Sequence, residues 1–408
     1  GLRKFQTAAS KELGHLLNGD DFSLPKYYNK FKASPEVFDL HDRNFQDYAI
    51  RTVQALAREG MDGGRDGDGP IPFDVLSLRM KKMGLESQAH RRLVRAYVYA
   101  VCSRSDLDWE GYPARDDAAV AKKEEYFAST WKECRLYNWW SDDAQTLAEV
   151  IDELKLPAQE QGSSQGLGCP VQVMEDNTQA CVEKCADMHP DSRIAWLNMA
   201  NAHKCGGNYD IHWGGSQEEG TATACDGIVQ LGRFSEREGV SGLAQWVKQI
   251  DAAVVYKSGY HIPPGGAIFC PTKFVTSDPQ VDCFMIATAF CDLRRKAPML
   301  TPYSEFSDYF SITGSVRNEG KLSQRLAMDM IGILMTAMHT KMDVLVLGAG
   351  GCGAFKHDPV REAKLWRVVL EGLTKFCSSK SVKFPFRAVY FGILPDKNNL
   401  PAFKKEFP

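Results

Sequence analysis

The residues best suited to chemistry are two adjacent glutamates, Glu218 and Glu219, which follow a glycine-containing segment. Glycine lets backbone N–H groups approach a ligand closely, and two carboxyls can supply hydrogen bonds and a proton to a sugar. A local structural explanation competes, because Ser216 and Glu219 have the spacing of a helix capping box, and on spacing alone it is favoured. The candidate residues of this segment are Asn201, Gly206, Gly207, Gln217, Glu218 and Glu219.

A second glycine-rich segment follows the apolar run Val344–Leu347 and precedes a helix predicted from about Pro359. Several N–H groups of such a loop can point at a diphosphate. Gly348, Gly350 and Gly353 also satisfy the G-x-G-x-x-G dinucleotide fingerprint, so a Rossmann domain is the competing interpretation. The candidate residues here are Gly348, Gly350, Gly351, Cys352, Gly353, Ala354 and Phe355.

Two observations count against a Rossmann domain. The predicted helix begins at about Pro359 instead of at the last glycine of the fingerprint. Only 55 residues follow Gly353, which is room for one more strand and not for a set of βαβ units. A single fingerprint so late in a chain is weak support for a dinucleotide site.

Cys181, Cys185 and His189 recur every four residues, so on a helix they would share one face and could ligate a metal. A fourth ligand is missing nearby, and buried cysteines are common on apolar helix faces. We therefore expect no metal site and no cofactor.

Composition narrows the class of protein. The 408 residues are 44% hydrophobic and carry a formal net charge of -3, so no global positive field indicates a direct nucleic-acid partner. No apolar stretch approaches the roughly 18 residues of a membrane span, and the first residues lack a signal-peptide core. The 12 scattered cysteines suit a reducing compartment. We expect no membrane association and a cytoplasmic or nuclear location, without a preference between the two.

Up to about residue 156 the sequence predicts helices, and Ser141 is expected to cap the last of them. Residues 157–168 are rich in Gln, Gly and Ser, as is typical of a linker. The predicted organisation is thus a helical accessory domain at 1–156, a linker at 157–168 and a second domain at 169–408. Three stripes at helical spacing support the first domain: Phe45, Tyr48, Val53 and Leu56; Leu93, Ala96, Tyr97 and Val101; and Leu147, Val150, Ile151 and Leu154.

After the linker, short apolar runs alternate with amphipathic helices, which indicates an α/β fold. Helices from Leu322 and after Pro359 carry apolar stripes that would cover a sheet. The predicted strands are Ile194–Met199, Ala252–Tyr256, Ala267–Cys270, Cys283–Ala287, Val344–Leu347 and Ala388–Phe391.

Together, the two glycine segments resemble the microbial-type poly(ADP-ribose) glycohydrolase family, whose signature is three glycines, six to eight residues and Gln-Glu-Glu. Residues 206–208 (Gly-Gly-Asn), eight residues and residues 217–219 (Gln-Glu-Glu) match it, with Asn replacing the third glycine. The family also has a strand ending in Leu-Gly-Ala, then Gly-Cys-Gly, a small residue and Phe, which residues 347–349 and 351–355 match. The resemblance covers residues 165–408 and none of the helical half.

The resemblance implies a macrodomain, in which a mixed sheet between two helical layers binds ADP-ribose at the strand ends. Here an all-α region would precede this three-layer α/β/α fold. Glu219 would be the general acid that protonates the leaving oxygen, and Glu218 would help to hold the ribose. The further implied ligand contacts are Asn201, Gly206 and Gly207 at the distal ribose, the loop Gly348–Ala354 at the diphosphate, and Phe355 on a ribose; Gln217 is also expected to bind ADP-ribose.

The implied function is hydrolysis of O-glycosidic bonds of ADP-ribose, with ADP-ribose, poly(ADP-ribose) or ADP-ribosylated protein as partner. The helical half is expected either to buttress the macrodomain or to bind a protein target. The chain departs from the family at Asn208, at Gly350, where relatives usually carry a bulky residue, and at residues 220–222. These departures motivate an alternative, a non-catalytic ADP-ribose reader, while the fingerprint alone motivates a nucleotide-dependent oxidoreductase. Like charges would raise a glutamate pKa and a helix N-terminus would lower it, so sequence leaves their protonation open.

Overall fold

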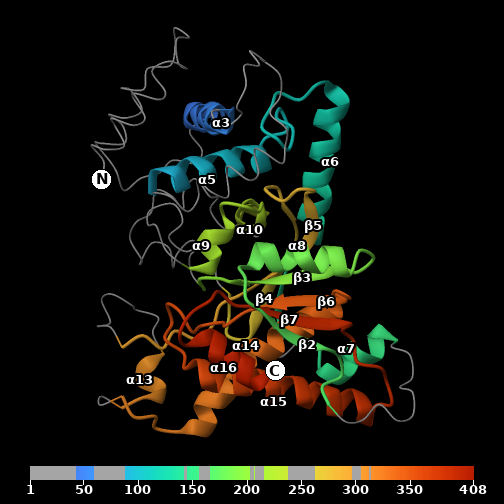
Figure 1. Ribbon diagram of the computed structural model, residues 1–408. Coiled ribbons are helices and arrows are strands. Elements are labelled where there is room, and N and C mark those ends of the chain that lie inside the picture. The colour runs from blue at the N-terminus through green and yellow to red at the C-terminus, as the bar shows by residue number, and fades with distance from the viewer. Residues whose placement is uncertain are drawn as a thin grey trace.

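The computed structural model describes residues 43–58, 88–141, 145–155, 166–202, 206, 216–237, 262–295, 305–311 and 314–408. Within these residues, seven strands form one mixed sheet in the order β1-β4-β5-β3-β6-β7-β2 (Figure 1). The strands are β1 (Arg135–Asn138), β2 (Val171–Met174), β3 (Ile194–Met199), β4 (Gly266–Phe274), β5 (Val281–Thr288), β6 (Val344–Leu347) and β7 (Ala388–Gly392).

Five neighbouring strands of the sheet, β5, β3, β6, β7 and β2, run parallel, while β4 is antiparallel to both β5 and β1. Trp196 on β3 pairs with Val346 on β6, so these two strands end at nearly the same level. All four residues of β6 are buried, as expected for a central parallel strand that is covered on both faces. The segments that leave β3 and β6 therefore emerge side by side at the carboxyl edge of the sheet.

Helices cover both faces of the sheet (Figure 1). Helices α8 (Thr178–Met188), α9 (Gln217–Thr221) and α10 (Gly227–Arg237) lie over one face, with α3 (Arg43–Arg58) and α5 (Gln88–Ser103) stacked beyond them. Helix α6 (Asp117–Glu133) contacts both α10 and strand β4. The other face carries α7 (Leu147–Leu154), α14 (Glu319–His339), α15 (Pro359–Ser379) and α16 (Asn399–Glu406), with α13 (Phe306–Tyr309) to one side. Within the described segments, no helix is both long and apolar enough to cross a membrane.

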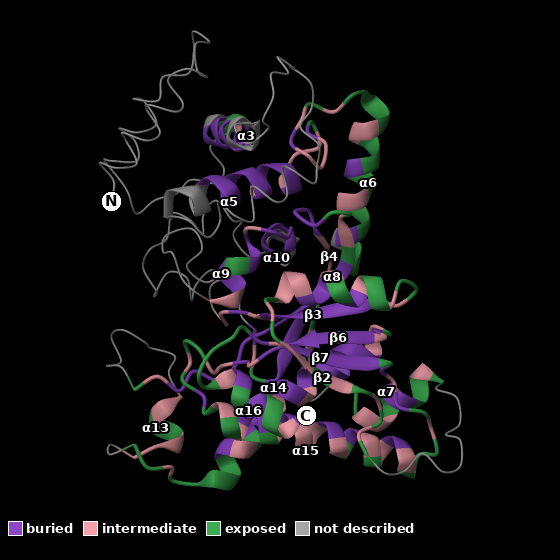
Figure 2. Ribbon diagram, in the orientation of Figure 1, coloured by how far each residue is buried: buried purple, intermediate pink, exposed green. Residues whose placement is uncertain are grey.

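Each face of the sheet has its own main hydrophobic cluster (Figure 2). On the α8 and α10 face, buried side chains of α3 and α5, such as Val53 and Val101, belong to the same cluster as Trp196 of the sheet. On the other face, Met330 of α14 and Trp366 of α15 pack with buried residues of the strands. The described N-terminal helices thus share a continuous core with the sheet.

The predicted α/β, macrodomain-like, three-layer fold is confirmed, and β3 and β6 have the predicted bounds. The prediction of helices throughout the first 156 residues is wrong for Arg135–Asn138, which form the edge strand β1. With only four residues, mostly exposed, β1 has no buried pattern that sequence could reveal. The strand predicted at 252–256 lies outside the described residues, and the domain boundaries at 156 and 169 stay a prediction.

The N-cap expected at Ser141 is also wrong, because helix α7 begins six residues later, after Thr146. Thr146 and Glu149 form a full capping box: the Thr146 hydroxyl accepts from the Glu149 N–H, and the Glu149 carboxylate accepts from the Thr146 N–H. Two reciprocal hydrogen bonds satisfy more of the free helix amides than a single serine can, which favours the later start.

Candidate functional site

Helix α9 is tied to the end of β3 by the side-chain amide of Gln217. Its Oε1 accepts a hydrogen bond from the Met199 N–H over 3.0 Å, and its Nε2 donates to the Leu197 carbonyl over 2.7 Å. The same nitrogen donates to the Thr178 hydroxyl on α8 over 3.1 Å. An amide side chain has the donor and the acceptor of a peptide group, so Gln217 satisfies two main-chain groups where β3 leaves the sheet.

The Glu218 carboxyl binds two residues that follow β3, Asn201 and Gly206, and Glu218 is only 2% exposed. The Asn201 N–H donates to Oε2 over 3.0 Å, and the Gly206 N–H donates to Oε1 over 2.9 Å. The Asn198 amide donates to Oε1 over a longer 3.5 Å. Burial raises the pKa of Glu218 to about 8, with a contribution from the Glu219 charge and against these donors, which lower it. Glu218 can therefore hold a proton near neutral pH.

Glu219 caps the helix on which it lies, as the local explanation of its spacing predicts. Its N–H donates to the Ser216 hydroxyl over 3.3 Å, and its Oε2 accepts from the Ser216 N–H over 3.4 Å. The residue is 6% exposed. The capping box fixes the rotamer of Glu219 at the first turn of α9, directly beside Glu218.

The loop that follows β6 is shaped by glycines. Gly351 has a φ of 72°, in the left-handed region that glycine adopts without strain. At three positions of this loop a Cβ would overlap a neighbouring side chain: Met199 at Gly348, Phe290 at Gly350 and His357 at Gly351. Gly353 differs from these three, since no described atom lies within 4 Å of a Cβ placed there.

A buried histidine and glutamate brace the same loop from inside. His357 Nε2 lies 2.6 Å from the Cys291 carbonyl oxygen, and His357 Nδ1 lies 3.1 Å from Glu362 Oε2. Because a carbonyl only accepts, Nε2 carries a hydrogen. Burial lowers the pKa of His357, but the Glu362 carboxylate outweighs it, so the pKa lies above its ordinary value. Sequence reasoning missed this pair; its only signal was a histidine directly before the helix N-cap.

Phe355 closes the loop beside the segment that leaves β5. Its carbonyl accepts from the Leu293 N–H over 3.0 Å, and the Arg294 guanidinium lies 5.3 Å from its ring centroid. Arg294 is held by Asp292, which accepts from its Nε over 2.8 and 3.0 Å. The half-buried ring therefore has a cation on one side. The positions of Asp292 and Arg294 at this edge were not predicted.

The structure brings the two predicted segments together, because Met199 at the end of β3 packs against Gly348 at the start of the other loop. Cys352 is half-buried, and Gly353 and Ala354 are exposed beside it. Gly207 lies outside the described residues. The Rossmann alternative finds no support in this architecture, since α15 begins at Pro359, capped by Asp358, and not at the last glycine of the fingerprint.

The cysteine and histidine series on α8 packs into the fold. Cys181 and Cys185 are buried, and burial raises the pKa of each thiol to about 12. His189 Nε2 lies 2.9 Å from the Tyr390 hydroxyl. Among the described residues, no group of three or more His, Cys, Asp or Glu side chains is arranged to hold a metal ion.

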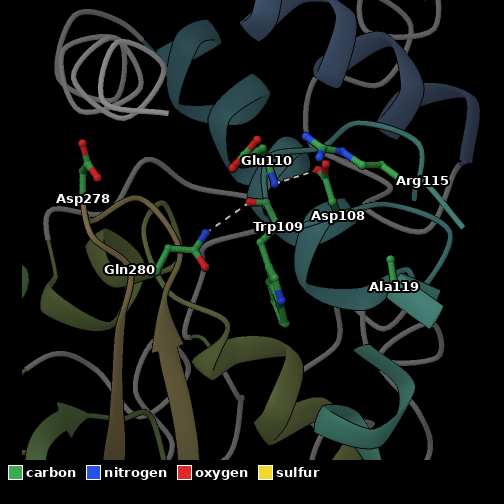
Figure 3. Close-up of a pocket in the computed structure, with 7 residues that line it drawn as sticks. All are labelled: Asp108, Trp109, Glu110, Arg115, Ala119, Asp278 and Gln280. Carbon is green, nitrogen blue, oxygen red and sulfur yellow. Dashed lines mark hydrogen bonds between the residues drawn. The ribbon is translucent and has the colours of Figure 1, made fainter. Parts of the chain in front are cut away.

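A pocket of about 470 Å³ lies beside the turn between β4 and β5, at the edge where the parallel strands begin (Figure 3). In it, Gln280 Nε2 donates to the Trp109 carbonyl over 3.4 Å, and the Glu110 N–H donates to Asp108 over 2.9 Å. The pocket is thus separate from α9, which is tied to the opposite edge. Its lining residues are Asp108, Trp109, Glu110, Arg115, Ala119, Asp278 and Gln280.

No protein-family model matches the sequence, and no curated protein matches it. Similar solved structures are bacterial poly(ADP-ribose) glycohydrolases. The enzyme from Thermomonospora curvata is 19% identical, with a TM-score of 0.51, over 78% of this chain and 100% of that chain. Its complex with the inhibitor ADP-HPD has a TM-score of 0.49 at 18% identity over the same shares. The Deinococcus radiodurans enzyme with ADP-ribose has 0.46 at 19%, over 68% and 96%. The chain thus has the fold of the T. curvata glycohydrolase.

Proposed function

We propose that this protein is an ADP-ribosyl glycohydrolase that cleaves O-glycosidic bonds of ADP-ribose in poly(ADP-ribose) or ADP-ribosylated protein. The observation that carries the proposal is the position of Glu218 and Glu219 at the carboxyl edge of β3, where Met199 packs against the glycine loop of β6. A loop of backbone amides beside a carboxyl pair suits a ligand that has a diphosphate and a sugar. The fold shared with the T. curvata glycohydrolase supports the same function.

In this proposal the loop Gly348–Ala354 receives the diphosphate through backbone N–H groups. The space beside Gly353, which no described side chain occupies, suits a close approach of phosphate oxygens. Phe355 packs on a ribose, with the nearby Arg294 adding positive charge on the same side. Asn201, Gly206 and Gly207 contact the distal ribose, and the Glu218 carboxyl accepts from the N–H groups of Asn201 and Gly206.

The reaction needs a proton at the departing oxygen. In this proposal Glu219 acts in its protonated form and donates the proton as the bond to the anomeric carbon breaks. Water then adds to the oxocarbenium-like centre, and the proton that the water loses restores the acid. Glu218, whose pKa burial raises to about 8, is mostly neutral at pH 7 and so adds no repulsion towards the diphosphate. Its hydroxyl can also donate a hydrogen bond to the ribose.

The test compares Glu219→Gln with a glutamate that has only a capping role. Glu149 on α7 occupies the same capping-box position with Thr146, and α7 lies on the opposite face of the sheet from α9 (Figure 1). With poly- and mono-ADP-ribosylated protein as substrates, Glu219→Gln should lower the rate of ADP-ribose release about 10²–10⁴-fold, the usual range for a lost general acid. Glu149→Gln should leave the rate unchanged. Equal rates for wild type and Glu219→Gln would overturn the proposal.

The hydrogen bonds of the two carboxyls favour a second candidate, an ADP-ribose reader without turnover. Glu219 caps α9 and Glu218 accepts from three amides, so both side chains have structural roles before any ligand arrives. A reader would bind ADP-ribose in a calorimetric titration and release none from either modified protein. Release by wild type that Glu219→Gln abolishes would exclude it.

A further inference from the structure

We propose that Arg95, on helix α5, is a positioning residue for the acid pair. It holds the main chain of α9 from the N-terminal helical half, so that this half is part of the acid site. The inference rests on the proposed function and deepens it, since it gives a role to a region that the glycine and glutamate motifs do not include.

Arg95 is buried in the interface between α5 and the rest of the fold. Its residue is 2% exposed, and its neighbours Val94 and Ala96 are fully buried. The guanidinium Nη2 donates to the main-chain carbonyl of Glu219 over 2.8 Å, across 124 positions of sequence. Burying a guanidinium costs free energy unless acceptors meet it, so this hydrogen bond helps to offset the cost of burying Arg95.

The Glu219 carbonyl lies near the end of a short helix and accepts a hydrogen bond from outside it. In a regular helix the N–H of Thr223, four residues later, would donate to it. Here α9 ends at Thr221 and the Thr223 N–H donates instead to the Gly220 carbonyl over 3.1 Å. Arg95 donates to the Glu219 carbonyl from another helix, at the point where α9 ends.

The consequence is that Glu219 is fixed on both sides of its Cα. The capping box holds its side chain and its N–H, while Arg95 holds its carbonyl. The preceding residue, Glu218, is anchored to the Asn201 and Gly206 amides. A displacement of a reacting group by about 1 Å can lower a rate about 10²-fold. Fixing the main chain of α9 therefore helps to keep the rate of ADP-ribose release high.

A second contact between the helical half and the sheet provides the control. The Tyr126 hydroxyl on α6 donates to Asp226 before α10 over 2.7 Å, and both groups are largely buried. Asp226 also accepts from the Lys273 N–H near the end of β4, at the edge of the sheet away from Met199. Tyr126→Phe therefore loosens the docking of the helices without touching α9.

The experiment measures kcat and KM for ADP-ribose release by the full chain and its variants. Arg95→Met keeps the length and removes the donors, so kcat should fall about 10–100-fold while KM stays within about threefold, because Arg95 acts through position and not through ligand contact. Arg95→Lys, which keeps a charge and a donor, should recover part of the loss. Tyr126→Phe should keep kcat within about twofold. An unchanged kcat in Arg95→Met, or an equal loss in Tyr126→Phe, would refute the role of Arg95.

Amide hydrogen exchange separates this inference from the proposed function. If the wild type releases no ADP-ribose, the glycohydrolase proposal fails, and the Arg95 proposal is decided by exchange over residues 216–225 in the full chain. Arg95→Met should speed exchange there about tenfold, and Tyr126→Phe should not, because only the first removes a hydrogen bond to α9. The same exchange in both variants would contradict the proposal. If Arg95→Met does not fold, Arg95→Lys is measured in its place.

Discussion

The two segments that leave β3 and β6 end at the same edge of the sheet, but they are held in different ways. The β3 segment is held by polar side chains, with Glu218 on two backbone amides and Gln217 on the end of the strand. The β6 loop is packed closely, since a Cβ at Gly350 or Gly351 would overlap Phe290 or His357, and it is braced from inside by the buried pair of His357 and Glu362. The β3 segment depends on buried polar groups that must stay hydrogen-bonded, and the β6 loop on close packing around a buried acid–base pair.

This difference fits the chemistry that each segment would perform. A loop that offers N–H groups to a phosphate needs a rigid backbone and no side chains in the way, which glycines packed on Phe290 and His357 provide. A segment that offers carboxyls must control their protonation, and burial with amide donors does so for Glu218. Helix α5 supports the segment that carries the carboxyls, through the hydrogen bond from Arg95 to the Glu219 carbonyl.

The sharpest way to break this comparison is to remove the brace inside the β6 loop. Glu362→Ala leaves His357 buried without its acid partner, and breaking a buried ionic pair in this way costs about 3–5 kcal/mol of unfolding free energy. Urea unfolding followed by tryptophan fluorescence measures the loss. Glu371→Ala is the control, because Glu371 lies on the same helix and pairs with Arg367 at the surface, where such a pair contributes at most about 1 kcal/mol.

If Glu362→Ala were no less stable than Glu371→Ala, the β6 loop would not depend on its internal brace. The loop would then resemble a surface turn, and rigidity would no longer distinguish it from the β3 segment. Glu362→Gln sharpens the result, since its amide oxygen can still accept from His357 Nδ1. It should fall between the other two variants.

A smaller effect separates the glycines that packing requires from the one that it does not. Gly350→Ala places a methyl group on the buried ring of Phe290, and overpacking of this kind costs about 1–3 kcal/mol. Gly353→Ala meets no described atom, so its unfolding free energy should change by less than about 0.5 kcal/mol. Under the proposed function it should instead weaken ADP-ribose binding, measured by calorimetry. Equal unfolding free energies for the two variants would show that close packing does not require glycine at position 350.

The parts of the fold that sequence predicts are those whose signal is local. Strand β6 is a continuous apolar run that ends at a glycine, and strand β3 is apolar except for Asn198; both have the predicted bounds. The two outermost strands were missed for a physical reason. Strands β1 and β2 have four residues each and are partly exposed, so neither an apolar run nor a clear alternation marks them.

The candidate site divides in the same way. The acid pair and both glycine segments are short motifs, so the sequence reveals them and also reveals the capping box that competes for Glu219. Arg95 and the pair of His357 and Glu362 are different, because their partners are set by the tertiary fold. The signal for Arg95 in the sequence was a basic residue between the apolar Val94 and Ala96, and it did not indicate which acceptor Arg95 would meet.

The smallest effect concerns the charge on the β3 segment and gives a dependence on pH. In the folded protein the pKa of Glu218 is raised from 4.5 to about 8, so between these values the folded state binds more protons than the unfolded state. Stability from this group is therefore full below pH 4.5 and is lost as pH rises through 8, by about 1.4 kcal/mol per pH unit in between. Urea unfolding at pH 6 and pH 7 should show this loss in wild type and a smaller one in Glu218→Gln, which cannot titrate. The same slope in both proteins would mean that Glu218 is already ionised in the fold, with the amides of Asn201 and Gly206 outweighing burial.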